Sequence, residues 1–183
     1  AALSFAHEIG VRYSEGLYKN PFIGRTFIMP GQKERKKSVR YKLVPQETEI
    51  RGKKVLIMDD SIVRGNTSRE IVKMLKDFGA KNVYFATACP PVKNPCFYGV
   101  DMPTKGELIA GNMNEEQIKR YLEVDALLYQ EIDDLVEAVT RKGNHNIDRP
   151  CMACLDGNYI ANDIDDAKIA EIEAMRNNDR NST

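Results

Sequence analysis

The sequence contains no tryptophan, only two histidines and no long hydrophobic run. A helix that crosses a membrane needs about 20 consecutive apolar residues, so the chain is not expected to span a bilayer. The 27 basic and 27 acidic residues cancel, which gives no overall attraction to nucleic acid or to a membrane surface. His7 and His145 have no visible partner and are assigned no role. Residues 1–10 lack the basic start of a secretory signal, so we expect a cytoplasmic protein whose four cysteines are not disulfide-bonded.

The remaining composition indicates one globular domain. Of the 183 residues, 42% are hydrophobic and 30% are charged, which is typical of a chain with a sizeable core. Short helices are expected to open near Thr104 and Asn114, where capping-box spacings occur. Longer patterns predict strands over 55–58, 83–88 and 126–129, and helices over 2–13, 66–78, 132–140 and 165–176. The alternation of strand and helix predicts an α/β fold with a mostly parallel sheet flanked by helices.

Residues 55–68 are the most informative stretch of the chain. Four apolar residues lead into Asp59 and Asp60, and a run of this kind is typical of a parallel strand buried on both faces. A short loop containing Gly65 follows, and two hydroxyl residues then open a helix. Open α/β sheets bind ligands at the carboxyl ends of their strands, and loop N–H groups at a helix start bind phosphates. The stretch therefore predicts an anion site beside a carboxylate pair.

The motif from Asp59 to Gly65 resembles the phosphoribosyl-diphosphate (PRPP) site of type I phosphoribosyltransferases, and specifically that of the amidophosphoribosyltransferases. Asn66 stands where this family usually has threonine, but asparagine can still donate and accept hydrogen bonds. The resemblance implies a type I phosphoribosyltransferase fold in which Asp59 and Asp60 bind the ribose hydroxyls, hold Mg²⁺ and take part in catalysis. It implies that ammonia displaces diphosphate from PRPP to give phosphoribosylamine, the first committed step of purine synthesis. It also implies a set of phosphate-binding residues: Ser61, Arg64, Gly65, Asn66, Thr67 and Ser68.

Residues 25–42 form the most basic stretch, with seven basic residues against Glu34 alone and hence a net charge of +6. Taken alone, the stretch fits a solvated surface loop. An RNA-binding loop is a second option, although Phe27 and Tyr41 are its only aromatic residues. Residues 24–40 resemble the flexible catalytic loop of the amidophosphoribosyltransferases, which favours a lid over an anionic substrate. In that lid four residues are expected to stabilise the departing diphosphate: Arg25, Lys36, Arg40 and Lys42.

The cysteines form a second group of candidate site residues. Cys151 and Cys154 make a CxxC motif, which alone fits half a zinc site, a redox pair or two small buried residues. One subgroup of the amidophosphoribosyltransferases carries a [4Fe–4S] cluster, and Cys96, Cys151 and Cys154 resemble three of its four ligands. The fourth family ligand would lie upstream of this chain. Cys89 does not match it in position.

The same resemblance sets expectations for the whole chain. The family has a strand, a loop and a glutaminase domain before the first helix. Residues 1–183 are therefore expected to be a single phosphoribosyltransferase domain, truncated at its N-terminus, with 146–183 as its C-terminal segment. Ammonia would come from glutamine through the missing glutaminase domain, so the chain itself should have no glutaminase activity. Purine nucleotides as feedback inhibitors and a homo-oligomeric state are further implications.

Two other functions fit the same motif. The first is a non-catalytic module that binds PRPP or nucleotides and regulates another protein, although such a sensor has no need of the basic stretch. The second is a nucleobase phosphoribosyltransferase, which would require a base-binding hood that is not identifiable in the sequence.

Overall fold

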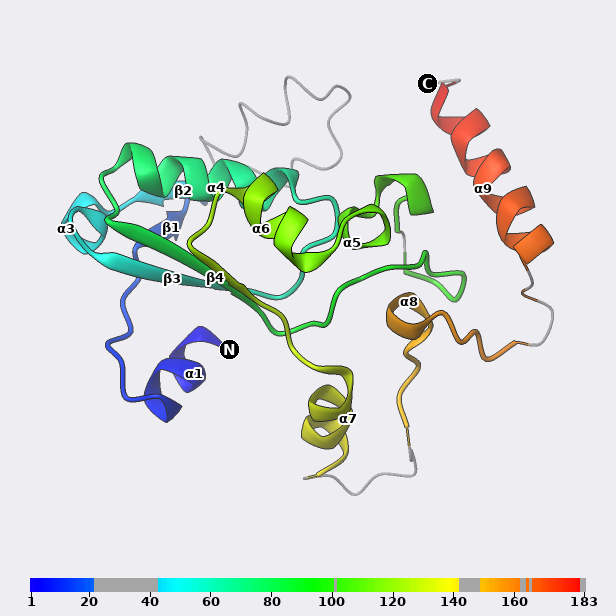
Figure 1. Ribbon diagram of the computed structural model, residues 1–183, viewed down its shortest axis with the longest axis horizontal. Helices are drawn as coiled ribbons and strands as arrows, with labels where there is room; N and C mark the ends of the chain where they lie inside the picture. The colour runs from blue at the N-terminus through cyan, green and yellow to red at the C-terminus, as the bar shows by residue number, and fades with distance from the viewer. Residues whose placement is uncertain (22–42, 101, 142–148, 162–163, 165, 182–183) are drawn as a thin grey trace.

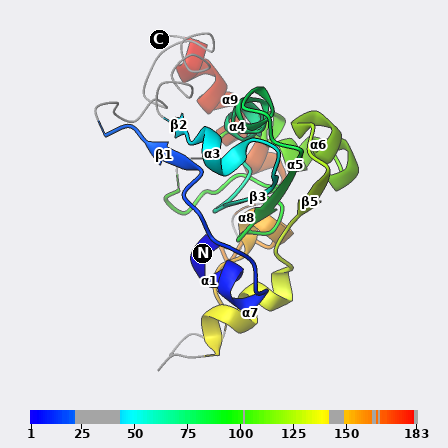
Figure 2. The ribbon, with the colours of Figure 1, turned by 90° about the vertical axis from the view of Figure 1, so that its left-hand side faces the viewer.

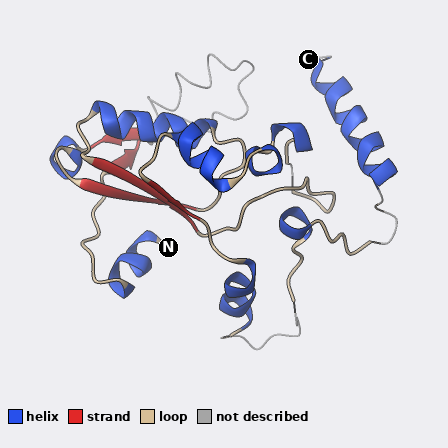
Figure 3. Ribbon diagram, viewed as in Figure 1, coloured by secondary structure: helices blue, strands red, loops and turns tan. Residues whose placement is uncertain are grey.

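The computed structural model describes residues 1–21, 43–100, 102–141, 149–161, 164 and 166–181. Two sheets occur in this part of the chain (Figures 1 and 3). After helix α1 (Ala2–Glu8), strand β1 (Leu17–Lys19) pairs antiparallel with β2 (Leu43–Pro45). The short helix α3 (Glu47–Ile50) then leads into the larger, parallel sheet.

The parallel sheet has the order β3-β4-β5 and is built from a strand–helix–strand unit. Strand β3 (Lys54–Asp59) runs beside β4 (Asn82–Thr87), and the register ends with Asp59 opposite Thr87. Strand β5 (Ala126–Leu128) adds to the other edge of β4. The Asp125 carboxylate fixes the start of both strands, because it accepts hydrogen bonds from the Val83 N–H at 2.7 Å and the Asn82 Nδ2 at 2.8 Å.

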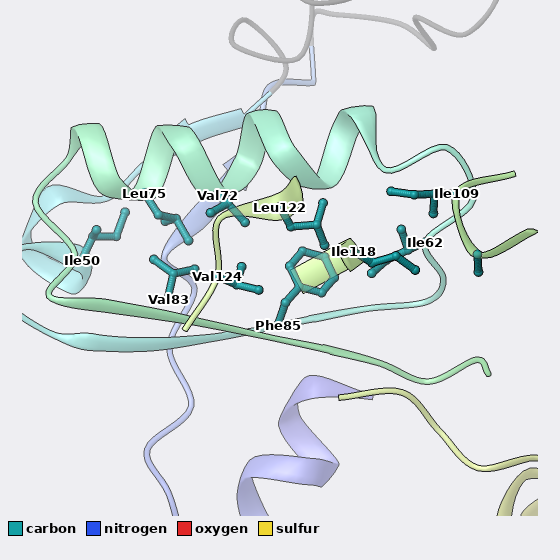
Figure 4. Packing of buried hydrophobic residues seen from close by; sticks show 11 residues of the cluster. Ile50, Ile62, Val72, Leu75, Val83, Phe85, Ile109, Ile118, Leu122 and Val124 are labelled. Carbon is teal, nitrogen blue, oxygen red and sulfur yellow. The ribbon is translucent and has the colours of Figure 1, made fainter. Parts of the chain in front are cut away.

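Helices α4 (Asn66–Asp77) and α6 (Glu115–Leu122) cover one face of this sheet. Their apolar residues meet those of β4 in a core that Figure 4 shows from close by. Phe85, Ile118 and Leu122 are fully buried there. Burial of such side chains stabilises the fold by roughly 1.5–3 kcal/mol each. The core therefore holds the sheet, α4 and α6 as one unit and sets where the strand ends and the start of α4 lie.

The opposite face of the sheet is less covered. Helix α1 contacts β3 on this side, and Figures 1 and 2 show it below the sheet. Leu56 points to this face and is 38% exposed, whereas Val55 and Ile57 pack against the core. The expectation that this strand is buried on both faces is therefore wrong. The physical reason is position: within the described residues β3 is an edge strand, and α1 covers only part of its outer face.

A second, smaller core joins segments that are far apart in sequence. Val92, Leu108, Met152 and Leu155 are buried together. The helical elements of this region are the 3₁₀ turn η2 (Lys105–Glu107), α5 (Ile109–Asn112), α7 (Ile132–Thr140) and α8 (Ala153–Asp156). Helix α9 (Asp166–Asn181) lies apart from the sheet in Figure 1. No helix in the described ranges is long and apolar enough to cross a membrane.

Most predicted elements are confirmed, and the α/β fold with a parallel sheet flanked by helices is confirmed as a whole. Both capping boxes form, at Thr104 with Glu107 and at Asn114 with Gln117. The first helix is shorter than expected, because the chain leaves helical geometry before Gly10, whose φ is +68°. The last helix is longer than expected and continues to Asn181. The predicted lid of residues 25–42 lies outside the described residues, as does most of the polar connection that the sequence predicts over 141–149.

Candidate active site

The two carboxylates lie at the carboxyl end of β3, as the sequence predicts. Asp59 is the last residue of the strand, and its carbonyl accepts a hydrogen bond from the Ala88 N–H of the neighbouring strand end at 3.1 Å. Asp60 follows as the first exposed residue of the loop. The Asp60 N–H donates to Asp59 Oδ1 at 2.9 Å, and the Ser61 hydroxyl donates to Asp60 Oδ1 at 3.2 Å. These short-range hydrogen bonds fix both carboxylates at the sheet edge.

The two carboxylates differ in their electrostatic environment. Asp59 is half-buried, and burial raises its pKa above the ordinary value of 3.8. The hydrogen bond from the Asp60 N–H lowers that pKa, whereas the charge of the Asp60 carboxylate raises it further. A partly desolvated carboxylate beside an exposed one attracts cations more strongly than either group alone in water. The pair can therefore accept hydroxyl hydrogens or approach a Mg²⁺ ion, which prefers few carboxylates plus phosphate oxygens and water.

The loop after the carboxylates ends at a helix start that has no capping side chain. Gly65 is the N-cap of α4, with φ of +74°. The sequence pattern predicts Asn66 or Thr67 as the N-cap, but both lie inside the first turn of α4, so that prediction is wrong. Glycine carries no side-chain oxygen, and the first N–H groups of a helix have no intrahelical acceptor. The donors at the start of α4 are therefore left for an anionic ligand.

Neighbouring elements hold this loop in place. The Ile109 N–H of α5 donates to the Val63 carbonyl at 2.9 Å. The Arg64 guanidinium is paired with Glu107 of η2, at 3.0 Å between Nε and Oε1. Arg64 was predicted to bind phosphate, but the structure directs its side chain to this carboxylate. Ser68 is buried in α4, whereas Thr67 is exposed.

Two contacts of this loop were not anticipated from the sequence. The sequence pattern predicts Glu107 only as the capping-box partner of Thr104, and Tyr121 only as part of the apolar face of the helix that opens near Asn114. Tyr121 instead donates its hydroxyl hydrogen to Asn66 Oδ1 at 2.9 Å. Both contacts join residues more than 40 positions apart in the chain. No local pattern indicates them, because they depend on how η2 and α6 pack against the start of α4.

The cysteine segments also come together. The Lys93 and Asn94 N–H groups both donate to the Cys154 carbonyl at 3.0 Å, and the Tyr159 hydroxyl donates to the Pro95 carbonyl at 2.8 Å. All four cysteines are free thiols. Burial raises the pKa of Cys154, and the nearby thiols of Cys96 and Cys151 raise it further. The described residues contain no group of three or more His, Cys, Asp or Glu side chains already placed to hold a metal ion.

The fold and the site define a class of protein: a phosphoribosyltransferase domain, with paired acids at a strand end followed by a glycine loop and an uncapped helix. Residues 23–105 match the family model described as the phosphoribosyl transferase domain. The amidophosphoribosyltransferase of Pseudomonas aeruginosa is 49% identical over 177 residues, which is 97% of this chain. Nearly the whole chain is therefore similar to part of an amidophosphoribosyltransferase, and the part that the family model matches is a phosphoribosyl transferase domain.

Solved structures agree with this assignment. The chain is similar to the glutamine phosphoribosylpyrophosphate amidotransferase from B. subtilis complexed with ADP and GMP, with a TM-score of 0.74 and 39% identity over 92% of this chain. It is also similar to the structure of an allosteric regulatory enzyme of purine biosynthesis, with a TM-score of 0.76 and 37% identity over 93% of this chain. The chain spans about a third of each of these relatives: 35%, 38% and 37% of their lengths.

Proposed function

We propose that this chain is the PRPP-binding part of an amidophosphoribosyltransferase, which transfers ammonia to PRPP and releases diphosphate in the first committed step of purine synthesis. The observation that carries the proposal is the end of β3, where Asp59 and Asp60 stand directly before the uncapped start of α4. This arrangement offers acceptors for sugar hydroxyls on one side and phosphate donors on the other.

The 5-phosphate of PRPP would bind at the start of α4, where Gly65 leaves the first N–H groups without a side-chain acceptor. The proposed ligand set is the backbone of the loop with the side chains of Ser61, Asn66, Thr67 and Ser68. Arg64 lies at the edge of this set and reaches the phosphate only by leaving Glu107, an exchange between two exposed partners that costs about 0–1 kcal/mol.

Breaking the bond to the anomeric carbon creates positive charge on the ribose and negative charge on the diphosphate. The carboxylates of Asp59 and Asp60 stabilise the ribose charge, because they are fixed before the ligand arrives. Mg²⁺ fits this pair, since it binds few carboxylates and completes its shell with phosphate oxygens and water. From the sequence resemblance, Arg25, Lys36, Arg40 and Lys42 would approach the diphosphate from the other side. These four residues lie outside the described part of the chain.

The proposal extends to the cysteines. Cys96, Cys151 and Cys154 would supply three thiolates of a [4Fe–4S] cluster, which needs four. Two features support this: the hydrogen bonds that join 93–95 to 154–159, and the proximity of the Cys96 and Cys151 thiols to Cys154, whose pKa they raise in addition to burial. The fourth ligand would come from a segment other than residues 1–183. Bound here, the cluster would hold the 93–98 and 149–159 segments together.

The relatives suggest the setting in which this part works. From the sequence resemblance, ammonia would be produced from glutamine by another part of the same protein, and purine nucleotides would act as feedback inhibitors. The name of one similar structure includes glutamine, and that of the other describes an allosteric regulatory enzyme of purine biosynthesis. The B. subtilis relative was solved with ADP and GMP bound, which supports a nucleotide site in the whole protein. A homo-oligomer and a cytoplasmic location remain part of the proposal.

The proposal is tested with Asp60→Asn in the full-length protein that carries this chain. With ammonia, Mg²⁺ and PRPP supplied, we expect diphosphate release to fall by about a hundredfold or more, because a fixed charge at the reaction centre is lost. Asp134→Asn, the same change at an exposed position of α7, is the matched control and should leave the rate unchanged. Equal melting temperatures would exclude unfolding as the cause.

Two results would contradict the proposal. Wild-type diphosphate release by Asp60→Asn would remove the carboxylate pair from the mechanism. A wild-type protein that binds PRPP but releases no diphosphate with ammonia would instead be a regulatory module on the same fold.

A further inference from the structure

Tyr121 of α6 packs against the loop that opens α4. Its hydroxyl donates to Asn66 Oδ1 at 2.9 Å. Its ring also lies beside Gly65: a Cβ built on that glycine would be 3.2 Å from Tyr121 Cε1 and 2.7 Å from Ile109 Cδ1. The tyrosine therefore contacts two successive residues of the proposed phosphate loop, although it comes from an element 55 positions further along the chain.

The tyrosine ring is itself held in place. The Arg69 guanidinium carbon lies 4.9 Å from the ring centroid, a cation–π arrangement. Arg69 is in turn paired with Glu123 at 3.2 Å between Nη2 and Oε1, and Lys76 approaches the same carboxylate at 3.8 Å. These contacts bind the C-terminal end of α6 to both the first and the last turn of α4. Tyr121 thus has little freedom to turn away from Asn66.

The hydrogen bond from Tyr121 determines which atom of the Asn66 side chain is left for a ligand. An amide group has one acceptor oxygen and one donor nitrogen. Tyr121 occupies the oxygen, and within the described ranges the Nδ2 group of Asn66 has no protein partner. An asparagine whose oxygen is turned toward Tyr121 in this way leaves its Nδ2 donor for a ligand. A donor attracts a phosphate oxygen, whereas an acceptor would repel it.

We propose that Tyr121 is a positioning residue for the sugar-phosphate ligand: it holds the Asn66 amide so that Nδ2 donates to the 5-phosphate of PRPP. This inference rests on the proposed function, because it assigns a role at the same phosphate site. Tyr121 does not touch the reacting bond. It acts on the part of the ligand that is unchanged in the reaction, so its contribution belongs to ligand binding rather than to the chemical step.

The test is Tyr121→Phe in the full-length protein, assayed with PRPP, Mg²⁺ and ammonia. Phenylalanine keeps the ring contacts to Gly65 and Arg69 and removes the hydroxyl, with its hydrogen bond to Asn66 and its interaction with the Arg69 side chain. We expect the KM for PRPP to rise about three- to tenfold, the size of one lost hydrogen bond, with kcat nearly unchanged. The matched control is Tyr13→Phe, the same change at an exposed tyrosine between α1 and β1, which should leave KM at the wild-type value.

A second pair of variants separates positioning from stability. Threonine is branched at Cβ and its χ1 angle is stiff, so in Asn66→Thr the hydroxyl needs no partner on α6. Tyr121→Phe should therefore have no further effect on KM in an Asn66→Thr background. A double-mutant cycle with this outcome shows that the tyrosine acts through Asn66.

The possible results are distinguishable. An unchanged KM in Tyr121→Phe overturns the inference, as does a variant whose melting temperature falls while KM stays constant. Additive effects of the two substitutions also overturn it, because Tyr121 would then act independently of Asn66. If the wild-type protein neither binds PRPP nor releases diphosphate, the proposed function itself fails, and the inference fails with it.

Discussion

Asp59 and Asp60 are adjacent in sequence, but they occupy different environments. Asp59 ends β3 and is half-buried, whereas Asp60 is exposed and accepts a hydrogen bond from the Ser61 hydroxyl. Burial and the neighbouring carboxylate raise the pKa of Asp59. Keeping this group charged at neutral pH therefore destabilises the folded chain. A residue that lowers stability in this way, at a strand end where a ligand would bind, is typical of a functional position.

The raised pKa of Asp59 predicts a pH-dependent effect on stability. Between the ordinary value of 3.8 and the higher folded-state pKa, the folded chain binds more protons at Asp59 than the unfolded chain. The contribution of this group to the free energy of unfolding therefore falls as pH rises through that window. Asp59→Asn removes the penalty and keeps an oxygen that can accept from the Asp60 N–H. We expect this variant to melt at a higher temperature than wild type at pH 7.

The difference in melting temperature should shrink as the pH is lowered through the same window, because the wild-type aspartate then becomes neutral. Thermal melts of both proteins over a pH series measure it. Asp133→Asn, at an exposed position in the first turn of α7, is the matched control and should not raise the melting temperature at pH 7, because a carboxylate at a helix start is not destabilising. A variant less stable than wild type at pH 7 would show that the charge is stabilising and would contradict the burial argument.

At the scale of elements, the start of α4 depends on one backbone conformation. Gly65 has φ of +74°, a region that L residues occupy only at a cost. It also lies against α5 and α6, since a Cβ there would meet Ile109 at 2.7 Å. The close approach of three elements at this glycine is what places the loop N–H groups at the sheet edge.

Gly65→Ala should therefore be destabilising for two reasons. The positive φ costs roughly 1–2 kcal/mol, and forcing a methyl group against Ile109 adds about 1–3 kcal/mol. Gly52→Ala is the matched control: Gly52 has φ of +72°, and nothing lies within 4 Å of its would-be Cβ. Chemical denaturation should show that Gly65→Ala lowers the free energy of unfolding by about 2–5 kcal/mol. Gly52→Ala should lower it by only the roughly 1–2 kcal/mol that the positive φ costs. Equal losses would show that the packing against α5 and α6 is unimportant.

At the scale of the whole molecule, residues 92–98 and 149–161 form one structural unit despite their separation in sequence. The backbone of Cys154 accepts two hydrogen bonds from 93–94, and the Tyr98 hydroxyl accepts one from the Ala161 N–H at 3.0 Å. A small apolar core including Val92 and Met152 lies beside them. Three of the four cysteines are carried by this unit.

This arrangement predicts the metal content of the full-length protein. Purified without oxygen, it should contain iron and acid-labile sulfide in equal amounts, and Cys154→Ser should lose most of both, because a cluster needs all four thiolates. Cys89→Ser is the matched control and should keep both, since Cys89 is not among the proposed ligands. Iron-free wild-type protein, or equal loss in the two variants, would rule out the proposed ligand set. Zinc without sulfide would indicate a different metal site.

Much of the fold could be predicted from local patterns. The βαβ unit follows from two apolar runs around a helical stripe, and the capping boxes at Thr104 and Asn114 follow from their spacing. The partial exposure of Leu56 could not be predicted in the same way. An apolar run has the same sequence whether or not both faces of its strand are covered, and only the elements that pack against the sheet decide.

The sequence alone determined the type of site in this protein, because two carboxylates, a glycine loop and a helix start are consecutive in the chain. Because they are neighbours in the chain, local geometry is enough to bring these three features together once the strand and the helix have formed. Only the tertiary structure decided that Arg64 pairs with Glu107, that Tyr121 holds Asn66 and that Gly65 has no room for a side chain. These contacts join residues of separate elements, and their formation depends on the shared core that packs α4, α5 and α6 against one another.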